Sequence, residues 1–334
     1  MRHTKFLAAV TAFLTVSFFS WAQTTEFRMI EDGGTGAYKA IVSADESLPD
    51  MSVYRPADLA SAVAKAGKLP VIVFANGGCF ASNTMDERFN SEIASHGYIL
   101  IGIGAYNPNP NTMTSEQLRA AQAADGRGEG RPATQTDNPD PARFAVANLT
   151  ADTSPLQLTN AINWIQKQNV TPTSEFYHMV DVDNIAVMGS SCGGMQALDV
   201  TYDTRVKTII LKNSGVFPPT TGLSMGGSSF KKNNLSDLKI PVMYMIGNEG
   251  DVAYPNATSD FEILTVPVVL CSNAKVGHEG TTLDPHGGEM GILAVKWLNW
   301  QLKGDKKSST VFLNAKYIKS NLPDWTIKTK NIKK

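Results

Sequence analysis

A short glycine-rich turn between a strand-like run and a helix-like run constrains the fold of this chain more than any other feature. Residues 189–194 read Gly-Ser-Ser-Cys-Gly-Gly and follow the apolar run Asn184–Met188. A serine in so tight a strand-to-helix turn needs small residues two positions before it and two positions after it, because larger side chains would collide with the strand or the helix. Gly189 and Gly193 meet that requirement for Ser191. The turn therefore predicts a buried strand, an accessible serine and a helix in direct succession.

Such a turn is typical of enzymes in which a serine side chain is the nucleophile. If Ser190 were that nucleophile, Met188 and Cys192 would occupy the two positions that must be small. Neither side chain is small enough, so Ser191 is the candidate nucleophile.

Short β-branched or apolar runs alternate with amphipathic stretches along most of the chain, and several runs are apolar on both faces. Because continuous apolarity in a strand indicates burial under helices on both sides of a sheet, this alternation predicts the α/β class. We expect a mostly parallel eight-stranded sheet with helices on both faces, and the first strands are close enough in sequence to pair antiparallel. The expected strands are Ala40–Ser43, Met51–Tyr54, Val71–Ala75, Tyr98–Ile103, Ile185–Met188, Thr208–Leu211, Val242–Ile246 and Val268–Cys271. The expected helices are Met85–Ser95, Ser154–Gln168, Gly193–Tyr202, Tyr254–Ile263 and Glu289–Leu302.

The first residues of the chain have the composition of a secretion signal. Arg2 and Lys5 precede the apolar run Phe6–Phe19, which is followed by Ser20–Ala22. The run is short for a membrane-spanning helix, and the small residues after it suit cleavage by a signal peptidase. We therefore expect a signal peptide over residues 1–22 and a periplasmic or secreted mature protein without stable membrane insertion. An uncleaved N-terminal anchor is the alternative.

The remainder of the chain is long enough for one domain. About 310 residues follow the expected cleavage site, which suffices for a single sizeable core over residues 23–334. Residues 106–144 lose periodicity and collect proline, asparagine, glycine and charge, so we expect an irregular insertion there, either a substrate-facing lid or a surface excursion. The basic tail Lys316–Lys334 is typical of a solvated terminus. With 30 basic and 31 acidic side chains, the chain has no net positive electrostatic field that would attract nucleic acid.

A serine nucleophile needs a base, and the base needs an acid that orients it. When the serine lies in a strand-to-helix turn, the acid and then the histidine follow it along the chain. The segment Gly247–Asp251 follows the strand-like run Pro241–Ile246, where an acid at the end of a strand is expected. Asp251 is the predicted acid. Glu249 stays open, because either carboxylate could reach an imidazole from this glycine-flanked loop.

Two histidines, His278 and His286, follow the serine turn, and both precede the last long helix. Glycines on both sides of His278 allow a loop to aim its imidazole inward, whereas His286 stands before a glycine pair and fits the entry of a helix. His278 is the predicted base, and His286 is the alternative. Together with Glu279 and Asp284 the histidines match no zinc spacing, so we predict no metal.

Acyl transfer through a serine also needs two N–H donors for the oxyanion of the tetrahedral intermediate. The residue after the nucleophile, Cys192, supplies one donor. The second is expected from the loop after an earlier buried strand, here Asn76–Phe80 after Val71–Ala75. Glycines in that loop allow the backbone to approach closely, and an ordinary glycine turn is the alternative.

These motifs together resemble the α/β-hydrolase superfamily, in particular its branch of dienelactone hydrolases, platelet-activating-factor acetylhydrolases and bacterial cutinase-like polyester hydrolases. The resemblance covers most of the mature chain. Outside the serine turn it rests on the glycine loop 76–79, on Ala94–Gly97, which reads Ala-Ser-His-Gly, and on the closing stretch 277–305. It implies the α/β-hydrolase fold, the second oxyanion donor at Cys79, and His278 as the base.

The resemblance has a consequence for the cysteines. If Cys79 and Cys192 both aim an N–H group at one oxygen, their Cα atoms are neighbours, so the assignment implies a disulfide between them. Cys271 would then be a free buried thiol. Two buried thiols at Cys79 and Cys192 are the alternative.

The predicted site consists of Ser191, Asp251 and His278 with donors at Cys79 and Cys192, and it needs no cofactor. We expect a secreted serine carboxylic-ester hydrolase that works through an acyl-enzyme. The resemblance implies acetyl or feruloyl esters of polysaccharides, or other short-chain esters, as substrates, whether small molecules or esterified polymers. A serine peptidase and a non-catalytic binding protein on the same fold are the alternatives.

Overall fold

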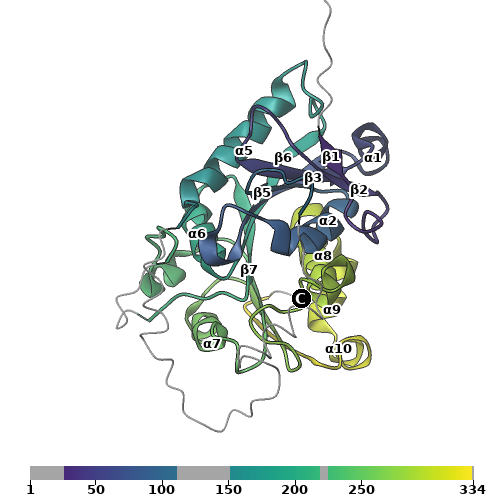
Figure 1. Cartoon of the computed structure of the whole chain (residues 1–334). Coiled ribbons are helices and arrows are strands. Elements are labelled where there is room, and N and C mark those ends of the chain that lie inside the picture. Colours follow the sequence, from purple (N-terminus) through teal and green to yellow (C-terminus); the bar gives the residue numbers. More distant parts are fainter. Residues whose placement is uncertain (1–25, 111–150, 219–224, 333–334) are drawn as a thin grey trace, which may run out of the picture.

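The computed structural model describes residues 26–110, 151–218 and 225–332 (Figure 1). The predicted signal peptide, residues 1–22, lies outside the described residues, as does the predicted insertion from residue 111 onward. Within the described ranges, no helix is long and apolar enough to cross a membrane.

The centre of the molecule is a ten-stranded sheet in the order β1-β2-β3-β5-β4-β6-β7-β8-β9-β10. The neighbours from β5 to β9 run parallel, and β1, β2, β3 and β10 add antiparallel pairs at the two ends. The chain thus has the predicted α/β class and a mostly parallel sheet. The strands are β1 (Phe27–Arg28), β2 (Ala40–Ser43), β3 (Met51–Pro56), β4 (Leu69–Ala75), β5 (Ile99–Ile103), β6 (Val180–Ser190), β7 (Val206–Lys212), β8 (Val242–Ile246), β9 (Val268–Asn273) and β10 (Trp325–Lys330).

The prediction of eight strands is wrong because it lacks both edge strands. β1 has two residues, too few to form a recognisable pattern. β10 lies in the basic tail that the composition assigns to a solvated terminus; instead, Lys328 pairs with Leu270 and Lys330 with Val268 of β9. Lysines are common on edge strands, because their charge opposes pairing with a further strand.

Helices cover both faces of the sheet, as predicted, and Figure 1 shows α5 and α6 on one side of the strands and α8 and α9 on the other. β4 shows the cause: Val71 and Val73 belong to one apolar core, Ile72 and Phe74 to the other, and all four are fully buried. The helices of the first face are α1 (Leu59–Ala66), α5 (Pro155–Val170), α6 (Cys192–Asp199) and α7 (Tyr254–Ile263). Those of the second face are α2 (Glu87–Ser95), α8 (Gly288–Lys303), α9 (Thr310–Leu313) and α10 (Ala315–Asn321).

The carboxyl ends of the parallel strands meet at one edge of the sheet. The turn after β6, the end of β7, the turn 247–251 after β8 and the loop 274–287 after β9 all lie at this edge. Open parallel sheets bind ligands at this edge. The candidate residues therefore converge although they are far apart in the sequence.

Candidate active site

Ser191 occupies the turn between β6 and α6 in a backbone conformation that few residues adopt, with φ 48° and ψ −117°. A Cβ on Gly189 would lie 2.1 Å from the carbonyl oxygen of Gly193, and a Cβ on Gly193 would lie 2.3 Å from that of Ala75. Neither position accepts a side chain, so the glycine spacing around Ser191 is a steric necessity. Backbone strain of this kind concentrates at functional sites, where a tight turn aims a side chain.

Hydrogen bonds hold the backbone of Ser191 on both sides. Its N–H donates to the carbonyl oxygen of Lys212 at the end of β7 over 2.8 Å. Its own carbonyl oxygen accepts from the hydroxyl of Ser214 over 2.7 Å and from the N–H of Gly194 over 3.0 Å. The fold itself therefore sets the direction of the Ser191 side chain.

The hydroxyl of Ser191 faces the imidazole of His278. Ser191 Oγ lies 2.9 Å from His278 Nε2, and His278 Nδ1 lies 2.6 Å from Asp251 Oδ1. In a neutral imidazole, Nδ1–H donates to the carboxylate and leaves Nε2 able to accept the serine proton. The structure thus brings the three predicted side chains from three separate connections into one hydrogen-bonded chain.

Asp251 is buried, with 1 % of its surface exposed, and both of its carboxylate oxygens accept several hydrogen bonds. Besides the contact with His278, Oδ1 accepts the N–H of Ala253 over 2.9 Å. Oδ2 accepts the N–H of Gly247 over 2.9 Å and the side-chain amide of Asn213 over 2.7 Å. Burial raises the pKa of Asp251, but the hydrogen bond and charge of His278, with the donors of Ala253 and Asn213, outweigh burial and hold the pKa below its ordinary value. Asp251 is therefore an oriented anion.

The pKa of His278 reflects opposing influences. Burial lowers it, whereas the hydrogen bond and the charge of Asp251, and then the charge of Glu279, raise it, and the charge of Lys212 lowers it. The net pKa lies above the ordinary value for histidine. A raised pKa makes the imidazole a better acceptor for the proton of a serine hydroxyl.

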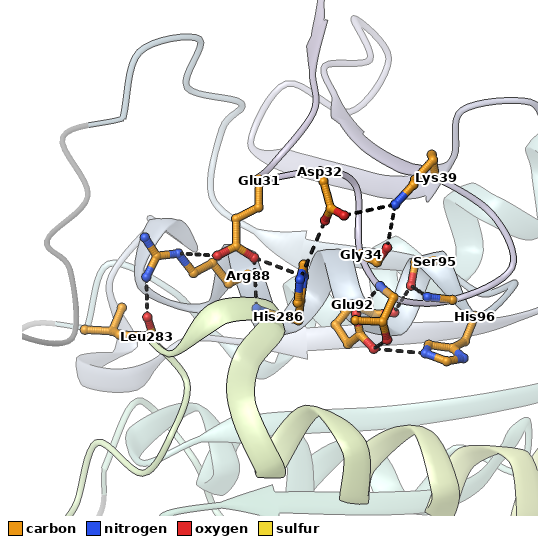
Figure 2. A network of polar contacts seen from close by, with 12 residues as sticks. Glu31, Asp32, Gly34, Lys39, Arg88, Glu92, Ser95, His96, Leu283 and His286 are labelled. Carbon is orange, nitrogen blue, oxygen red and sulfur yellow. Dashed lines mark hydrogen bonds and ion pairs between the residues drawn. The ribbon is translucent and has the colours of Figure 1, made fainter.

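Asp251 and His278 make the contacts that lead to Ser191, and the two alternatives left open by the sequence have other surroundings. Glu249 is exposed in the turn that carries the predicted acid. Figure 2 shows His286 beside Glu31 and Asp32, with Nδ1 3.2 Å from Glu31 Oε2 and Nε2 3.6 Å from Asp32 Oδ1. In the described part of the chain, no group of three or more histidine, cysteine, aspartate or glutamate residues could hold a metal ion.

Sequence reasoning missed a polar residue that completes this arrangement. Asn213 donates to Asp251 Oδ2, and the same amide also reaches the carbonyl oxygen of Gly277 over a longer 3.4 Å. It thereby ties the turn of the acid to the loop of the histidine. The available signal was the polar triplet Lys212–Ser214, which directly follows the apolar run of β7 at the edge where parallel sheets bind ligands.

Cys79 and Cys192 form the inferred disulfide, with their Cα atoms 5.4 Å apart, and Cys271 is a free buried cysteine in β9. The alternative of two buried thiols is therefore wrong. Cys192 is the first residue of α6, a position whose N–H has no partner within a helix. The N–H of Cys79 donates to the carbonyl oxygen of Asn76 over 3.3 Å, which is long for such a bond. The disulfide joins the loop after β4 to the helix that begins beside Ser191.

The loop after β4 approaches the serine turn with its backbone. A Cβ on Gly77 would lie 3.6 Å from Ser190 Oγ and 3.9 Å from Ser191 Cβ. These are ordinary contact distances, whereas Gly78, with φ 64°, has no room for a side chain, because a Cβ there would lie 2.3 Å from the ring of Phe80. Small residues at these positions leave backbone groups, and no bulky side chains, next to Ser191.

Comparison with known proteins identifies no family for this chain. No protein-family model matches the chain, and no curated protein matches it.

Proposed function

We propose that this protein is a serine carboxylic-ester hydrolase of the α/β-hydrolase fold. The observation that carries the proposal is the hydrogen-bonded chain from Ser191 through His278 to Asp251, built on a strained strand-to-helix turn. A serine in such a turn, followed along the chain by an acid and then a histidine, is the arrangement of α/β-hydrolases. The mostly parallel sheet with helices on both faces agrees with that fold.

In the first half of the proposed reaction, Ser191 Oγ attacks the carbonyl carbon of the ester while His278 Nε2 takes the hydroxyl proton. Asp251 holds the ring in the required tautomer and stabilises the imidazolium that forms. The carbonyl oxygen becomes an oxyanion, for which the N–H groups of Cys192 and Cys79 are the proposed donors. The intermediate then collapses, the alcohol leaves with the proton from His278, and the acyl group stays on Ser191.

In the second half, a water molecule attacks the acyl carbon and gives a proton to His278. The second intermediate releases the carboxylic acid, and the proton returns to Ser191 Oγ, so no cofactor is consumed. The long bond from the Cys79 N–H to Asn76 supports its proposed role, because a donor so weakly engaged can be shared with a second acceptor.

The proposed substrates are acetyl or feruloyl esters of polysaccharides, or other short-chain esters, either small molecules or esterified polymers. The proposed location is periplasmic or extracellular, since structural disulfides such as Cys79–Cys192 persist in oxidising compartments. A serine peptidase uses the same groups and is the second candidate.

Hydrolysis of p-nitrophenyl acetate and butyrate tests the proposal, with Ser191→Ala as the active-site variant and Ser190→Ala as its matched neighbour. We expect Ser191→Ala to lower kcat by about 10⁴-fold or more, and Ser190→Ala to retain most of the activity. A folded protein that cleaves no ester, and whose Ser191 is not labelled by a fluorophosphonate, would contradict the proposal. Cleavage of peptides without cleavage of esters would favour the peptidase.

A further inference from the structure

Lys212, the last residue of β7, is a buried cation next to the candidate active site. Only 4 % of its surface is exposed. Its Nζ lies 2.7 Å from Asp86 Oδ1, donates a hydrogen bond of 2.6 Å to the hydroxyl of Thr282, and lies 5.8 Å from the centre of the Phe89 ring. A buried ion pair gives little net stability compared with apolar residues of similar size, because both charges lose their hydration. Stability alone therefore does not explain a lysine at this position.

The contacts of Lys212 join three segments that carry parts of the site. Its carbonyl oxygen accepts the N–H of Ser191, so its backbone supports the serine turn. Its side chain reaches Asp86, which ends the short 3-10 helix Thr84–Asp86 beyond the loop after β4. It also reaches Thr282 in the loop 274–287, which carries His278. Lys212 is thus bonded to the serine segment and to the histidine segment.

The charges that face His278 come from three elements. Asp251 belongs to the turn after β8, Glu279 is the next residue of the histidine's own loop, and Lys212 ends β7 with its Nζ hydrogen-bonded to Thr282 of that loop. The two carboxylates favour the imidazolium form, and the Lys212 ammonium opposes them. A general base has to be neutral before it can accept a proton, so a nearby cation keeps the base available at lower pH.

We propose that Lys212 is a positioning residue of this site, which holds the His278 loop against β7 through Thr282 and keeps a buried positive charge against that loop. The proposal rests on the proposed function, since it assigns Lys212 a part in making His278 a base. Lys212 acts through His278 and through the backbone of the serine turn, without touching the substrate.

The first experiment compares the pH profile of kcat/KM for p-nitrophenyl butyrate in the unchanged protein and in two variants. Lys212→Met removes the charge and keeps a stem of similar length, whereas Thr282→Val removes the hydroxyl and keeps the charge. Without the Lys212 charge, we expect the acidic limb of the pH profile to move to higher pH. The loss of kcat/KM in Lys212→Met should therefore be about threefold or more larger at pH 6 than at pH 8. Thr282→Val is expected to lower kcat without moving the acidic limb of the pH profile.

An acidic limb that stays in place in folded Lys212→Met would overturn the charge part of the proposal and leave a structural ion pair. If Lys212→Met fails to fold because Asp86 is left buried and unpaired, the double variant Asp86→Asn/Lys212→Met removes both charges and is measured in its place. In this double variant we expect the acidic limb to move in the same direction by a smaller amount. An unmoved limb would again overturn the proposed effect of the Lys212 charge.

A second measurement does not depend on catalysis. An NMR titration of the His278 imidazole, with and without Lys212→Met in a Ser191→Ala background, reports the protonation of the ring directly. A midpoint that moves to higher pH supports the charge of Lys212 even if the protein cleaves no ester, and an unmoved midpoint contradicts it. Failure of this inference is thereby distinguished from failure of the proposed function.

Discussion

The two ends of the loop after β9 present the same type of side chain in different surroundings. His278 contacts Asp251, whose side chain is completely buried, while the two carboxylates near His286 have side chains 24 % and 66 % exposed, at Glu31 and Asp32. A charge shielded from water interacts strongly and holds a ring in one orientation, whereas exposed charges are screened. The second ring nitrogen of His278 faces a serine hydroxyl. A carboxylate beside a histidine is therefore common to both places; the burial of the carboxylate and the third partner distinguish His278.

The largest expected effect separates the two histidines directly. We expect His278→Ala to lower kcat for p-nitrophenyl butyrate by about 10⁴-fold or more, because it removes the proposed base. His286→Ala is expected to stay within about threefold of the unchanged protein, since its ring lies in the contacts with Glu31 and Asp32. Kinetics on the two variants, with circular dichroism as the folding control, checks this. Equal losses in both variants would contradict the distinction between His278 and His286.

The next effect concerns the carboxylate that orients the ring. Asp251→Asn keeps the shape of the side chain but not its charge, and we expect a fall in kcat of about 10³- to 10⁴-fold at pH 7. Glu249→Gln, in the same turn but exposed, is the matched control and is expected to change kcat by less than twofold. Steady-state kinetics decides between them, and a large loss in Glu249→Gln would restore Glu249 as the acid.

The smallest effect tests what the other end of the loop does. Glu31 accepts the backbone N–H of His286 over 2.8 Å and lies 3.4 Å from Arg88 Nε, so it joins the N-terminal segment to the loop and to α2 (Figure 2). Glu31→Gln is expected to lower the free energy of unfolding by about 0.5–1 kcal/mol and to leave kcat almost unchanged. Thermal melts provide the measurement, and Asp32→Asn, at a more exposed position, is the control. A loss of activity without a change in melting temperature would mean that this end of the loop also contributes to catalysis.

The central strands were predictable from sequence because their burial requires a continuous apolar pattern. A strand covered by helices on both faces has to be apolar at every position, and Val71–Ala75 has that pattern. The edge strands have no such continuous apolar pattern. The Lys328 and Lys330 side chains of β10 resemble those of a solvated tail, and only the pairing with β9 distinguishes the two.

The serine turn was the most predictable part of the site, because its requirements are local: a strand, a helix and two positions that have no room for a side chain. Chain order narrowed the acid and the histidine to two candidates each; the sequence favoured Asp251 and His278, and these are the two that the structure joins to Ser191. Asn213 and Lys212 were missed, since their partners Asp251 and Thr282 lie far along the chain.

The α/β class, the buried parallel strands and the turn at Ser191 were predictable from residue order, because each follows from the sterics and burial of neighbouring residues. Three choices were left to the fold: His278 and not His286 faces Ser191, Cys79 pairs with Cys192, and Lys212 lies buried between Asp86 and Thr282. These choices depend on distances across several strands of the sheet. Such distances are set by the packing of the whole molecule, and residue order along the chain does not specify them.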